Sequence, residues 1–373
     1  MWASPFIVLN IEVWSFRKNI FPYLFPITVH DKLLRKIKFF RYLCHFRCLT
    51  DKLTEMTIRV KDHRHFILFA KFQKLLDLAS ELECNVVYNE PLSKHTTFRT
   101  GGACTAMVDI SSEESLAKLV RAAHEWNVRY IVVGNGSNLL FDDKGYEGVV
   151  FLMGQSVDEI KMMNENTIYA EAGCSLIKLC RFALEHNLKG LEFAYGIPGT
   201  VGGAIYMNAG AYDGEIKNVI TSANSVRADG TVHTTEANKM ALAYRSSCYQ
   251  KNGEVITSGV FRLEAGAYDD IQDKMVELMG RRRSKQPLEY PSAGSTFKRP
   301  EGQFAGKLIE DCGLRGYTVG GAQVSEKHCG FVVNKGGATT EDIMSVIRHV
   351  QHIVKEQTGY LLECEVKIIP YKE

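Results

Sequence analysis

The chain has 373 residues, of which 45% are hydrophobic and 24% are charged, as is usual for a globular protein. This length suits two or three domains, and the composition excludes a disordered chain, a coiled coil, a collagen-like fibre and a small disulfide scaffold. Nine basic and four acidic residues give residues 1–55 a charge of +5, while 36 basic and 39 acidic residues give the remainder −3. The acidic remainder gives no electrostatic indication of nucleic-acid binding.

The first 55 residues differ from the rest of the chain. They contain none of the 31 glycines but hold 11 of the 38 aromatic residues. Their uncharged runs are too short to span a bilayer, and their basic residues follow the apolar ones, unlike those of a signal peptide. One interpretation is a basic, aromatic anchor at a membrane surface. The other, which we favour, is a translated upstream region, with the fold starting at Met56 or nearby.

Ten cysteines are scattered along the chain without a CxxC pair or the spacing of a disulfide framework. Together with the absence of a secretory signal, this pattern indicates reduced thiols in a cytoplasmic protein. We expect no metal site, no membrane span and no obligate protein partner.

Hydrophobic periodicity and capping signals predict mixed helices and strands in the first part of the chain. A capping box at Ser111-x-x-Glu114 opens one helix, and Ser175 caps another that ends at Lys189-Gly190. An Asp229-Gly230 turn predicts a hairpin over residues 223–233. The other expected elements are a helix over residues 66–83 and strands over 130–133, 148–152, 167–170 and 255–263.

The last third of the chain predicts a second lobe. Residues 268–285 form a charged helix, Thr339-x-x-Asp342 opens a further helix, and residues 361–369 form a final strand. Helices and strands do not alternate strictly, so we predict an α+β fold with two lobes divided near residue 265. The expected domains are 56–265 and 266–373, with residues 1–55 outside the fold.

Two glycine-rich clusters, residues 133–140 and 196–203, indicate ligand-binding loops. Glycine lets the backbone approach a ligand closely, and successive N–H groups can hold phosphate oxygens. Leu139 replaces the third glycine of the Rossmann fingerprint, and no Gly-Lys-Ser/Thr follows as in a Walker A loop. The pattern therefore predicts phosphate-binding loops of another type, for a ligand such as a dinucleotide. The alternative is a pair of tight turns between strands.

Three other positions carry chemically useful side chains. Arg245 lies among hydroxyl residues, Ser295 lies in a glycine turn near a lysine, and Glu365 lies on the final strand. Each alone has an ordinary structural explanation: a surface ion pair, a turn residue and a solvent-facing carboxylate.

Taken together, the motifs resemble the UDP-N-acetylenolpyruvoylglucosamine reductase (MurB) family over about residues 85–370. The lack of a long insertion in the C-terminal lobe resembles the shorter type II subgroup. The motifs occur in the order Pro91–Gly102, 134–140, 196–203 with Asn208-Ala209-Gly210, Tyr-Arg-Ser-Ser at 244–247, Pro-Ser-Ala-Gly-Ser-x-Phe-Lys at 291–298, and Glu365-Val366.

The resemblance implies an FAD-binding fold of the vanillyl-alcohol-oxidase (PCMH) type with a smaller C-terminal substrate-binding domain. It also implies noncovalent FAD, NADPH as co-substrate, and reduction of UDP-N-acetylglucosamine enolpyruvate to UDP-N-acetylmuramate for peptidoglycan synthesis. Arg299 stands where the family often has Asn, which puts its contact with the substrate in question.

The resemblance further assigns roles to residues of this chain. Arg245 and Glu365 are expected in the active site, and Ser295 is expected to donate a proton. Lys285, Lys298 and Tyr244 are expected to bind substrate. By their charge, Lys285, Lys298 and the basic run 281–283 suit the phosphates of the substrate or of NADPH, and the alternative is a solvated basic turn. The expected FAD-binding residues are Gly134, Asn135, Gly136, Ser137, Asn138, Leu139, Gly199, Thr200, Gly202, Gly203, Ala209 and Gly210.

Two other functions remain open at this point. An oxygen-using alcohol or sugar oxidase could share the FAD lobe, but the C-terminal set of Ser295, Lys298 and Glu365 argues against it. A flavin- or nucleotide-binding module without catalysis is the second alternative. Bound flavin that NADPH fails to bleach would favour that module.

The unusual composition of residues 1–55 leads to a test of their role. A chain that starts at Met56 is expected to bind FAD and to be as active as the full chain. Flavin absorbance and turnover of the two proteins, purified in parallel, measure this. Loss of flavin from the shorter protein would show that residues 1–55 belong to the fold.

Overall fold

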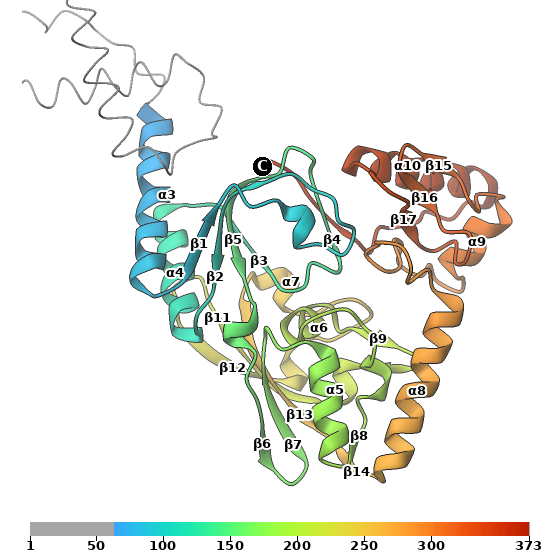
Figure 1. The fold of residues 1–373 in the computed structure, drawn as a ribbon, viewed down its shortest axis with the longest axis horizontal. Coiled ribbons are helices and arrows are strands. Elements are labelled where there is room, and N and C mark those ends of the chain that lie inside the picture. Colours follow the sequence, from blue (N-terminus) through green and yellow to red (C-terminus); the bar gives the residue numbers. More distant parts are fainter. Residues whose placement is uncertain (1–62, 373) are drawn as a thin grey trace, which may run out of the picture. The chain divides into compact units, whose positions relative to one another are not determined.

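In the computed structural model, which describes residues 63–372, a mixed four-stranded sheet forms the first layer (Figure 1). Its order is β1 (Asn85–Tyr88), β2 (Cys104–Asp109), β5 (Tyr146–Leu152) and β3 (Tyr130–Val133). Strand β1 is antiparallel to β2, whereas β2, β5 and β3 are parallel. Strand β3 ends at Val133, so the first glycine loop begins at the carboxyl end of this strand. The expectation for residues 1–55 lies outside the described residues.

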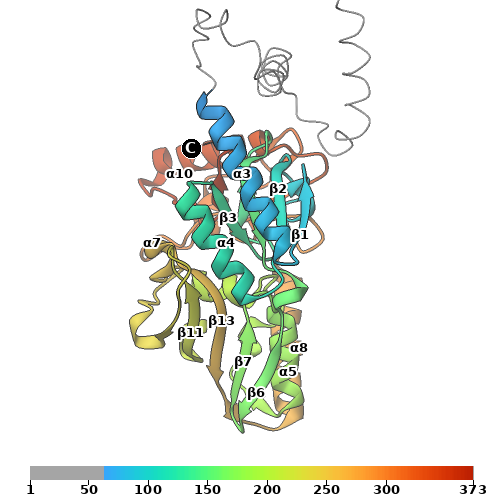
Figure 2. The same ribbon diagram turned by 90° about the vertical axis from the view of Figure 1, so that its left-hand side faces the viewer.

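Two helices, α3 (His63–Glu81) and α4 (Glu113–Trp126), cover one face of this sheet (Figure 2). Their apolar sides share a buried core with alternate residues of the strands, including Leu76, Leu116 and Val149. The predicted capping box is displaced by one residue. The Ser112 hydroxyl accepts the N–H of Ser115, while the preceding serine donates its hydroxyl to a backbone carbonyl.

A five-stranded antiparallel sheet forms the second layer. Its order is β12 (Val232–Glu236), β11 (Ile220–Val226), β13 (Val255–Arg262), β7 (Thr167–Glu171) and β6 (Ile160–Asn164). The predicted hairpin joins β11 to β12. Helices α5 (Leu176–Glu185), α6 (Val201–Met207) and α8 (Tyr268–Lys285) contribute to the core of this layer. Helix α8 follows residue 265 in the chain, but its Ile271 and Met275 pack into the core of this layer. The domain boundary near residue 265 therefore stays a prediction.

The C-terminal part is a small α+β layer to which α8 leads (Figure 1). Strands β15 (Thr318–Val319), β16 (Ala322–Val324) and β17 (Val332–Asn334) pair antiparallel. Helices α9 (Ala305–Asp311) and α10 (Thr340–Thr358) pack with them around a separate core. Thr339 and Asp342 form the predicted capping box of α10. The shorter elements are β8 (Leu188–Lys189), β9 (Gly210–Ala211), β10 (Gly214–Glu215), α7 (Tyr249–Asn252) and β14 (Glu264–Ala265).

The end of the chain returns from the C-terminal layer to the first one. Strand β18 (Lys367–Ile369) pairs in parallel with β4 (Leu139–Phe141), which directly follows the first glycine loop. The predicted strand over 361–369 is therefore too long. Cys364 instead forms a single bridge with Phe297, and the chain changes partner between that bridge and β18. Glu365 lies at this change of partner.

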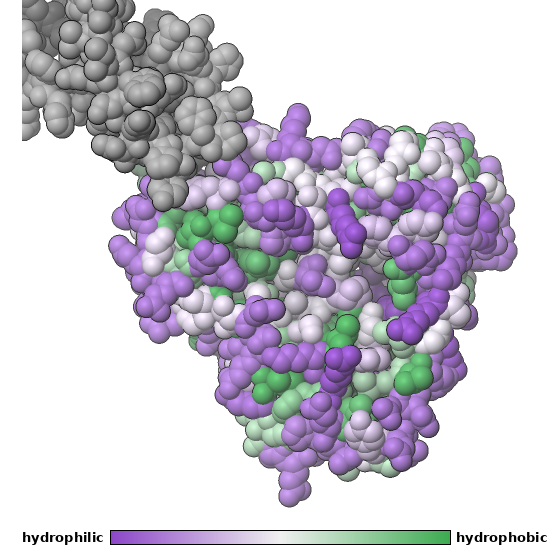
Figure 3. All heavy atoms as spheres, in the orientation of Figure 1, coloured by the Kyte–Doolittle hydropathy of each residue, from purple (hydrophilic) through white to green (hydrophobic). Residues whose placement is uncertain are grey.

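Apolar side chains are concentrated in the buried cores rather than on the face drawn in Figure 3. Hydrophilic residues cover most of that face, and the hydrophobic ones form scattered patches. Among residues 63–372, no helix combines the length and apolar character that crossing a bilayer requires.

The capping box of α10 gives a test of the C-terminal layer. Thr339→Ala removes the oxygen that accepts the N–H of Asp342 at 3.0 Å. We expect the free energy of unfolding to fall by about 0.5–2 kcal/mol, measured by urea denaturation. Thr339→Ser keeps the acceptor and should restore most of the loss. Equal stability of the alanine variant and the wild type would contradict the capping role.

Candidate functional site

A large cavity of about 1790 Å³ lies where loops of all three layers converge. Both glycine loops line it, together with the turn that carries Arg245, the segment 286–295 and Glu365. Cavities that hold one drug-sized ligand measure about 300–1,000 Å³. This cavity is therefore large enough for a cofactor and a substrate side by side.

The two glycine loops lie against each other. The side-chain amide of Asn135 donates to the carbonyl oxygen of Pro198 at 2.7 Å. A β-carbon at Gly134 would overlap the side chain of Thr200, so a larger residue there would push the loops apart. Gly136 has a φ of +57° and packs against the backbone of His95. The sequence-based expectation that both loops serve one ligand agrees with this contact.

The first glycine loop has the donors that a phosphate-containing cofactor requires. Within the described residues, the backbone N–H groups of 135–138 donate to no other protein group. The buried hydroxyl of Thr97, another residue that lines the cavity, also has no hydrogen-bond partner there. Buried polar groups normally have partners, and successive free N–H groups suit phosphate oxygens. These residues therefore fit an FAD diphosphate.

All twelve residues expected to bind FAD line the cavity. They are Gly134, Asn135, Gly136, Ser137, Asn138, Leu139, Gly199, Thr200, Gly202, Gly203, Ala209 and Gly210. The three expected catalytic residues, Arg245, Ser295 and Glu365, line it as well. Their individual roles remain predictions, but the structure brings all of them to one place.

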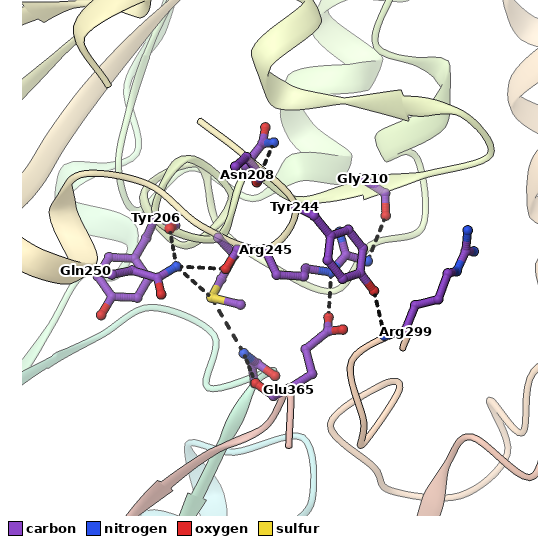
Figure 4. Close-up of polar contacts among 11 residues, drawn as sticks. Tyr206, Asn208, Gly210, Tyr244, Arg245, Gln250, Arg299 and Glu365 are labelled. Carbon is purple, nitrogen blue, oxygen red and sulfur yellow. Dashed lines mark hydrogen bonds and ion pairs between the residues drawn. The ribbon is translucent and has the colours of Figure 1, made fainter. Parts of the chain in front are cut away.

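Arg245 is held in a tight turn (Figure 4). Ala243 and Ser246 exchange both backbone hydrogen bonds at 3.1 Å, which leaves Arg245 inside a two-residue turn with a φ of +51°. This conformation is uncommon for a residue other than glycine and needs support from its surroundings. The buried amide of Asn208 donates to the Ala243 carbonyl at 3.0 Å, and Gln250 donates to the Arg245 carbonyl at 3.0 Å.

The guanidinium of Arg245 forms an ion pair with Glu365, and the two residues come from opposite sides of the cavity (Figure 4). The distance from Nε to Oε1 is 2.6 Å, and the side chains are only 22% and 12% exposed. Arg245 also donates through Nη2 to the carbonyl of Gly210 at 3.2 Å. The guanidinium is thus oriented by the carboxylate of Glu365 and by the backbone carbonyl of Gly210.

Glu365 is fixed through its backbone. Its N–H donates to the carbonyl of Thr296 at 2.8 Å, and its carbonyl accepts from the Asn138 side chain at 3.2 Å. Burial raises the pKa of the Glu365 carboxyl above its usual range, and Arg245 offsets part of that shift. Burial therefore favours the protonated form of Glu365 more than solvent would, and Arg245 favours the charged form.

Ser295 belongs to a loop that the C-terminal core holds rigidly. The next residue, Thr296, is buried and donates its N–H to Gly330 at 2.8 Å, and its hydroxyl accepts the N–H of Val332 at 3.0 Å. Gly294, with a φ of +74°, turns the chain before the serine. Because Thr296 also binds the backbone of Glu365, the serine and the carboxylate share one support.

The three residues expected to bind substrate do not line the cavity. Lys285 is exposed at the end of α8, and Lys298 forms a 3.0 Å ion pair with Glu363. Tyr244 is 52% exposed and accepts the N–H of Arg299 at 3.2 Å at the edge of the site (Figure 4). Arg299 does line the cavity. A substrate role for the first three remains a prediction.

Sequence reasoning missed two residues that shape the site, Asn208 and Gln250. Asn208 supports the arginine turn, but its motif was noted only for its resemblance to the family. Gln250 supports the same turn, and nothing in its local sequence marks it. The sequence did single out the basic run 281–283 for substrate or NADPH phosphates; of this run, Arg282 lines the cavity and its two neighbours do not. The helical spacing of the run explains this difference, since only one face of α8 can point toward the cavity.

Comparisons with known proteins agree with this arrangement. Residues 104–236 match a family model described as "FAD binding domain". Residues 286–369 match "UDP-N-acetylenolpyruvoylglucosamine reductase, C-terminal domain". The expected combination of a PCMH-type FAD-binding fold with a C-terminal α+β domain is thereby confirmed.

Relatives match the chain over most of their length. A UDP-N-acetylenolpyruvoylglucosamine reductase of Clostridium perfringens is 47% identical over 301 residues, which cover 81% of this chain and 98% of the relative. The enzyme of that name from Agathobacter rectalis is 48% identical over 298 residues, with 77% and 95% covered. The crystal structure of UDP-N-acetylenolpyruvylglucosamine reductase (MurB) from Thermus caldophilus matches with a TM-score of 0.66 and 32% identity, covering 77% of this chain and 99% of that one. The chain belongs to the UDP-N-acetylenolpyruvoylglucosamine reductase (MurB) family.

Proposed function

We propose that the protein is an NADPH-dependent flavoenzyme that reduces UDP-N-acetylglucosamine enolpyruvate to UDP-N-acetylmuramate in peptidoglycan precursor synthesis. The observation that carries this proposal is the largely buried ion pair of Arg245 with Glu365 inside the cavity, beside the glycine loops. An arginine there can bind a substrate carboxylate, which the enolpyruvyl group supplies. Family membership supports the same activity and FAD as the cofactor.

The reaction adds two hydrogens across the carbon–carbon double bond of an enolpyruvyl ether. NADPH loses a hydride, one carbon of the double bond gains it, and the other carbon gains a proton, so NADP⁺ and the lactyl ether result. When bound, FAD supplies the hydride-transfer chemistry that links the two substrates. The protein must orient the alkene, stabilise negative charge on the carboxylate side, and deliver one proton.

Arg245 is the residue placed to orient the substrate. A guanidinium presents a planar, forked set of donors that matches a carboxylate. The turn and the hydrogen bond to Gly210 fix the direction of this fork before substrate arrives. Such fixed donors stabilise negative charge without reorganisation during the reaction.

Glu365 shares Arg245 with the incoming carboxylate. A second anion near a carboxylate whose pKa burial already raises favours its protonated form. We infer that substrate binding is accompanied by proton uptake at Glu365. The neutral acid can then donate a hydrogen bond to the charge that develops on the substrate.

Ser295 is the proposed proton donor to the second carbon. Its hydroxyl is carried into the cavity by the loop anchored at Thr296, on the same support as Glu365. The substrates are small nucleotides of cytoplasmic metabolism, so we propose that the enzyme acts in the cytoplasm and needs no protein partner for turnover.

Replacing Ser295 separates the two half-reactions. Reduction of the flavin by NADPH needs no proton at the substrate carbon. The flavin of the Ser295→Ala variant should therefore bleach with NADPH as fast as that of the wild type. Reoxidation by UDP-N-acetylglucosamine enolpyruvate should slow by about 10²–10⁴-fold, the usual contribution of a positioned general acid. Stopped-flow flavin absorbance follows each step.

Ser292→Ala, in the same cavity-lining segment, is the matched control and should leave both steps close to wild type. If Ser295→Ala slows only flavin reduction, the serine has another role. If it changes neither step, Ser295 is a turn residue.

The raised pKa of Glu365 predicts a pH-dependent stability difference. A carboxyl whose folded pKa lies above the unfolded value near 4.5 stabilises the fold fully below that pH and loses this contribution as pH rises through the folded pKa. Glu365→Gln cannot titrate. Urea denaturation at several pH values from about 4 to 8 should therefore show the wild type losing stability relative to the variant as pH rises. A difference that is constant, or that changes in the opposite direction, would disprove the raised pKa.

A further inference from the structure

Residues 325–331 form the tight loop between β16 and β17, and this loop supports the one that carries Ser295 (Figure 1). The N–H of Ser325 donates to the carbonyl of Phe331 at 2.9 Å and closes the loop. The carbonyl of Gly330 accepts the N–H of Thr296 at 2.8 Å, directly after the serine. The loop contains one histidine, His328, which no step above uses.

The imidazole of His328 holds the loop in this shape. The backbone N–H of Gly330 donates to Nδ1 of the ring at 3.1 Å. A backbone amide can only donate, so Nδ1 acts as the acceptor and carries no proton. Among residues 63–372, no other protein group accepts this buried N–H. The loop therefore requires the neutral ring with a free Nδ1.

The ring is packed closely on several sides. A β-carbon at Gly330 would be 2.9 Å from its Cε1, and one at Gly306 of α9 would be 3.1 Å from the same atom. Phe331, which lines the cavity, meets the ring edge to face with centroids 5.1 Å apart. The ring thus fits because both neighbours are glycines. It contacts the support of the serine loop, helix α9 and one wall of the cavity.

The surroundings of His328 favour its neutral form. The ring is half-buried, and burial lowers its pKa below the usual value near 6.5. Arg315 acts in the same direction and Glu310 of α9 in the opposite one, and these two pair with each other at 2.6 Å. Burial raises the pKa of the Cys329 thiol, so this neighbour stays uncharged. The remaining charged residues of the loop and of α9 are exposed: Glu326, Lys327, Lys307 and Asp311.

A proton on Nδ1 would set two donors against each other. The buried N–H of Gly330 would lose its acceptor, which is unfavourable for a buried group. Glycine can rotate its backbone away from the ring, and the carbonyl that accepts from Thr296 would move with it. Thr296 follows Ser295 and also accepts the N–H of Glu365. The charge state of one imidazole therefore affects the support of both residues.

We propose that His328 is a positioning residue whose neutral ring holds the Ser295 loop in place, and that protonation of the ring releases this loop. The inference rests on the proposed function, in which Ser295 delivers a proton to the substrate. Reduction of the flavin by NADPH does not use this loop. Acid pH should therefore slow reduction of the substrate while reduction of the flavin continues.

The test uses the FAD-loaded full chain and His328→Asn, whose side-chain oxygen can accept from Gly330 but cannot titrate. Stopped-flow absorbance follows reoxidation of the reduced flavin by UDP-N-acetylglucosamine enolpyruvate from about pH 4.5 to 8. Below about pH 6.5, the wild type should slow by about tenfold or more relative to the variant, since a misplacement of about 1 Å can cost about 100-fold. Titration of Glu365 cancels in this ratio because both proteins contain it.

Two further variants sharpen the result. His352→Asn replaces an exposed histidine of α10 and is the matched control, so its pH profile should equal that of the wild type. His328→Leu removes the acceptor at every pH, so reoxidation at neutral pH should slow by about tenfold or more while flavin reduction stays within about twofold.

Equal pH profiles of the wild type and His328→Asn overturn the proposal, and so does a leucine variant with the wild-type rate. If the leucine variant does not fold, the two pH profiles decide. Loss of flavin or of the fold in His328→Asn also overturns the proposal, because the protein would then need the ring rather than its acceptor.

Nitrogen NMR of the histidine-labelled wild type tests the ring without turnover. The signal of His328 is the one missing from His328→Asn, and its Nδ1 should carry no proton at neutral pH and gain one with a midpoint below about 6.5. A proton on Nδ1 at neutral pH overturns the proposal. A wild type that the substrate does not reoxidise at neutral pH would refute the proposed function alone, and the NMR titration would still decide whether the neutral ring supports the loop.

Discussion

The parallel pairing of β18 with β4 is the constraint on which the site depends. It brings the end of the chain back to the strand that directly follows the first glycine loop. Just before β18, the backbone of Glu365 is fixed by Thr296 on one side and Asn138 on the other. The strand pairing and these two hydrogen bonds therefore join the first glycine loop, the loop of Ser295 and the Glu365 carboxylate. Hydrogen bonds of Asn334 to Phe98 and of Thr340 to Phe141 add to this pairing and also hold the C-terminal layer against the first one.

The same pairing places the Glu365 carboxylate beside the guanidinium of Arg245. A carboxylate buried at the junction is unfavourable unless a cation compensates it, and Arg245 provides that cation from the opposite side of the cavity. Together, Arg245 and Glu365 carry no net charge, and an incoming carboxylate would add one negative charge. In the proposed reaction, the substrate carboxylate competes with Glu365 for the arginine, and a proton moves onto Glu365. The unusual backbone conformation of Arg245, supported by Asn208 and Gln250, keeps the guanidinium directed for this exchange.

Local signals predicted most elements because they are short-range. The helix over 268–285, the strand over 130–133 and the cap at Thr339 agree with the structure. The error in the last strand has a different cause. Alternating side chains suggested one strand from 361 to 369, but long-range pairing changes partner after Cys364, which no local pattern reveals. Likewise, the motifs pointed to Arg245 and Glu365, whereas their ion pair across 120 positions and the support from Gln250 depend on the tertiary fold.

An anaerobic titration of the wild-type protein tests the central claim most directly. NADPH should bleach the flavin absorbance, and one equivalent of UDP-N-acetylglucosamine enolpyruvate should then restore it without oxygen. Mass spectrometry should show a product with two more hydrogen atoms than the substrate. Flavin that NADPH does not reduce, or that only oxygen reoxidises, would contradict the account and favour a binding module or an oxidase.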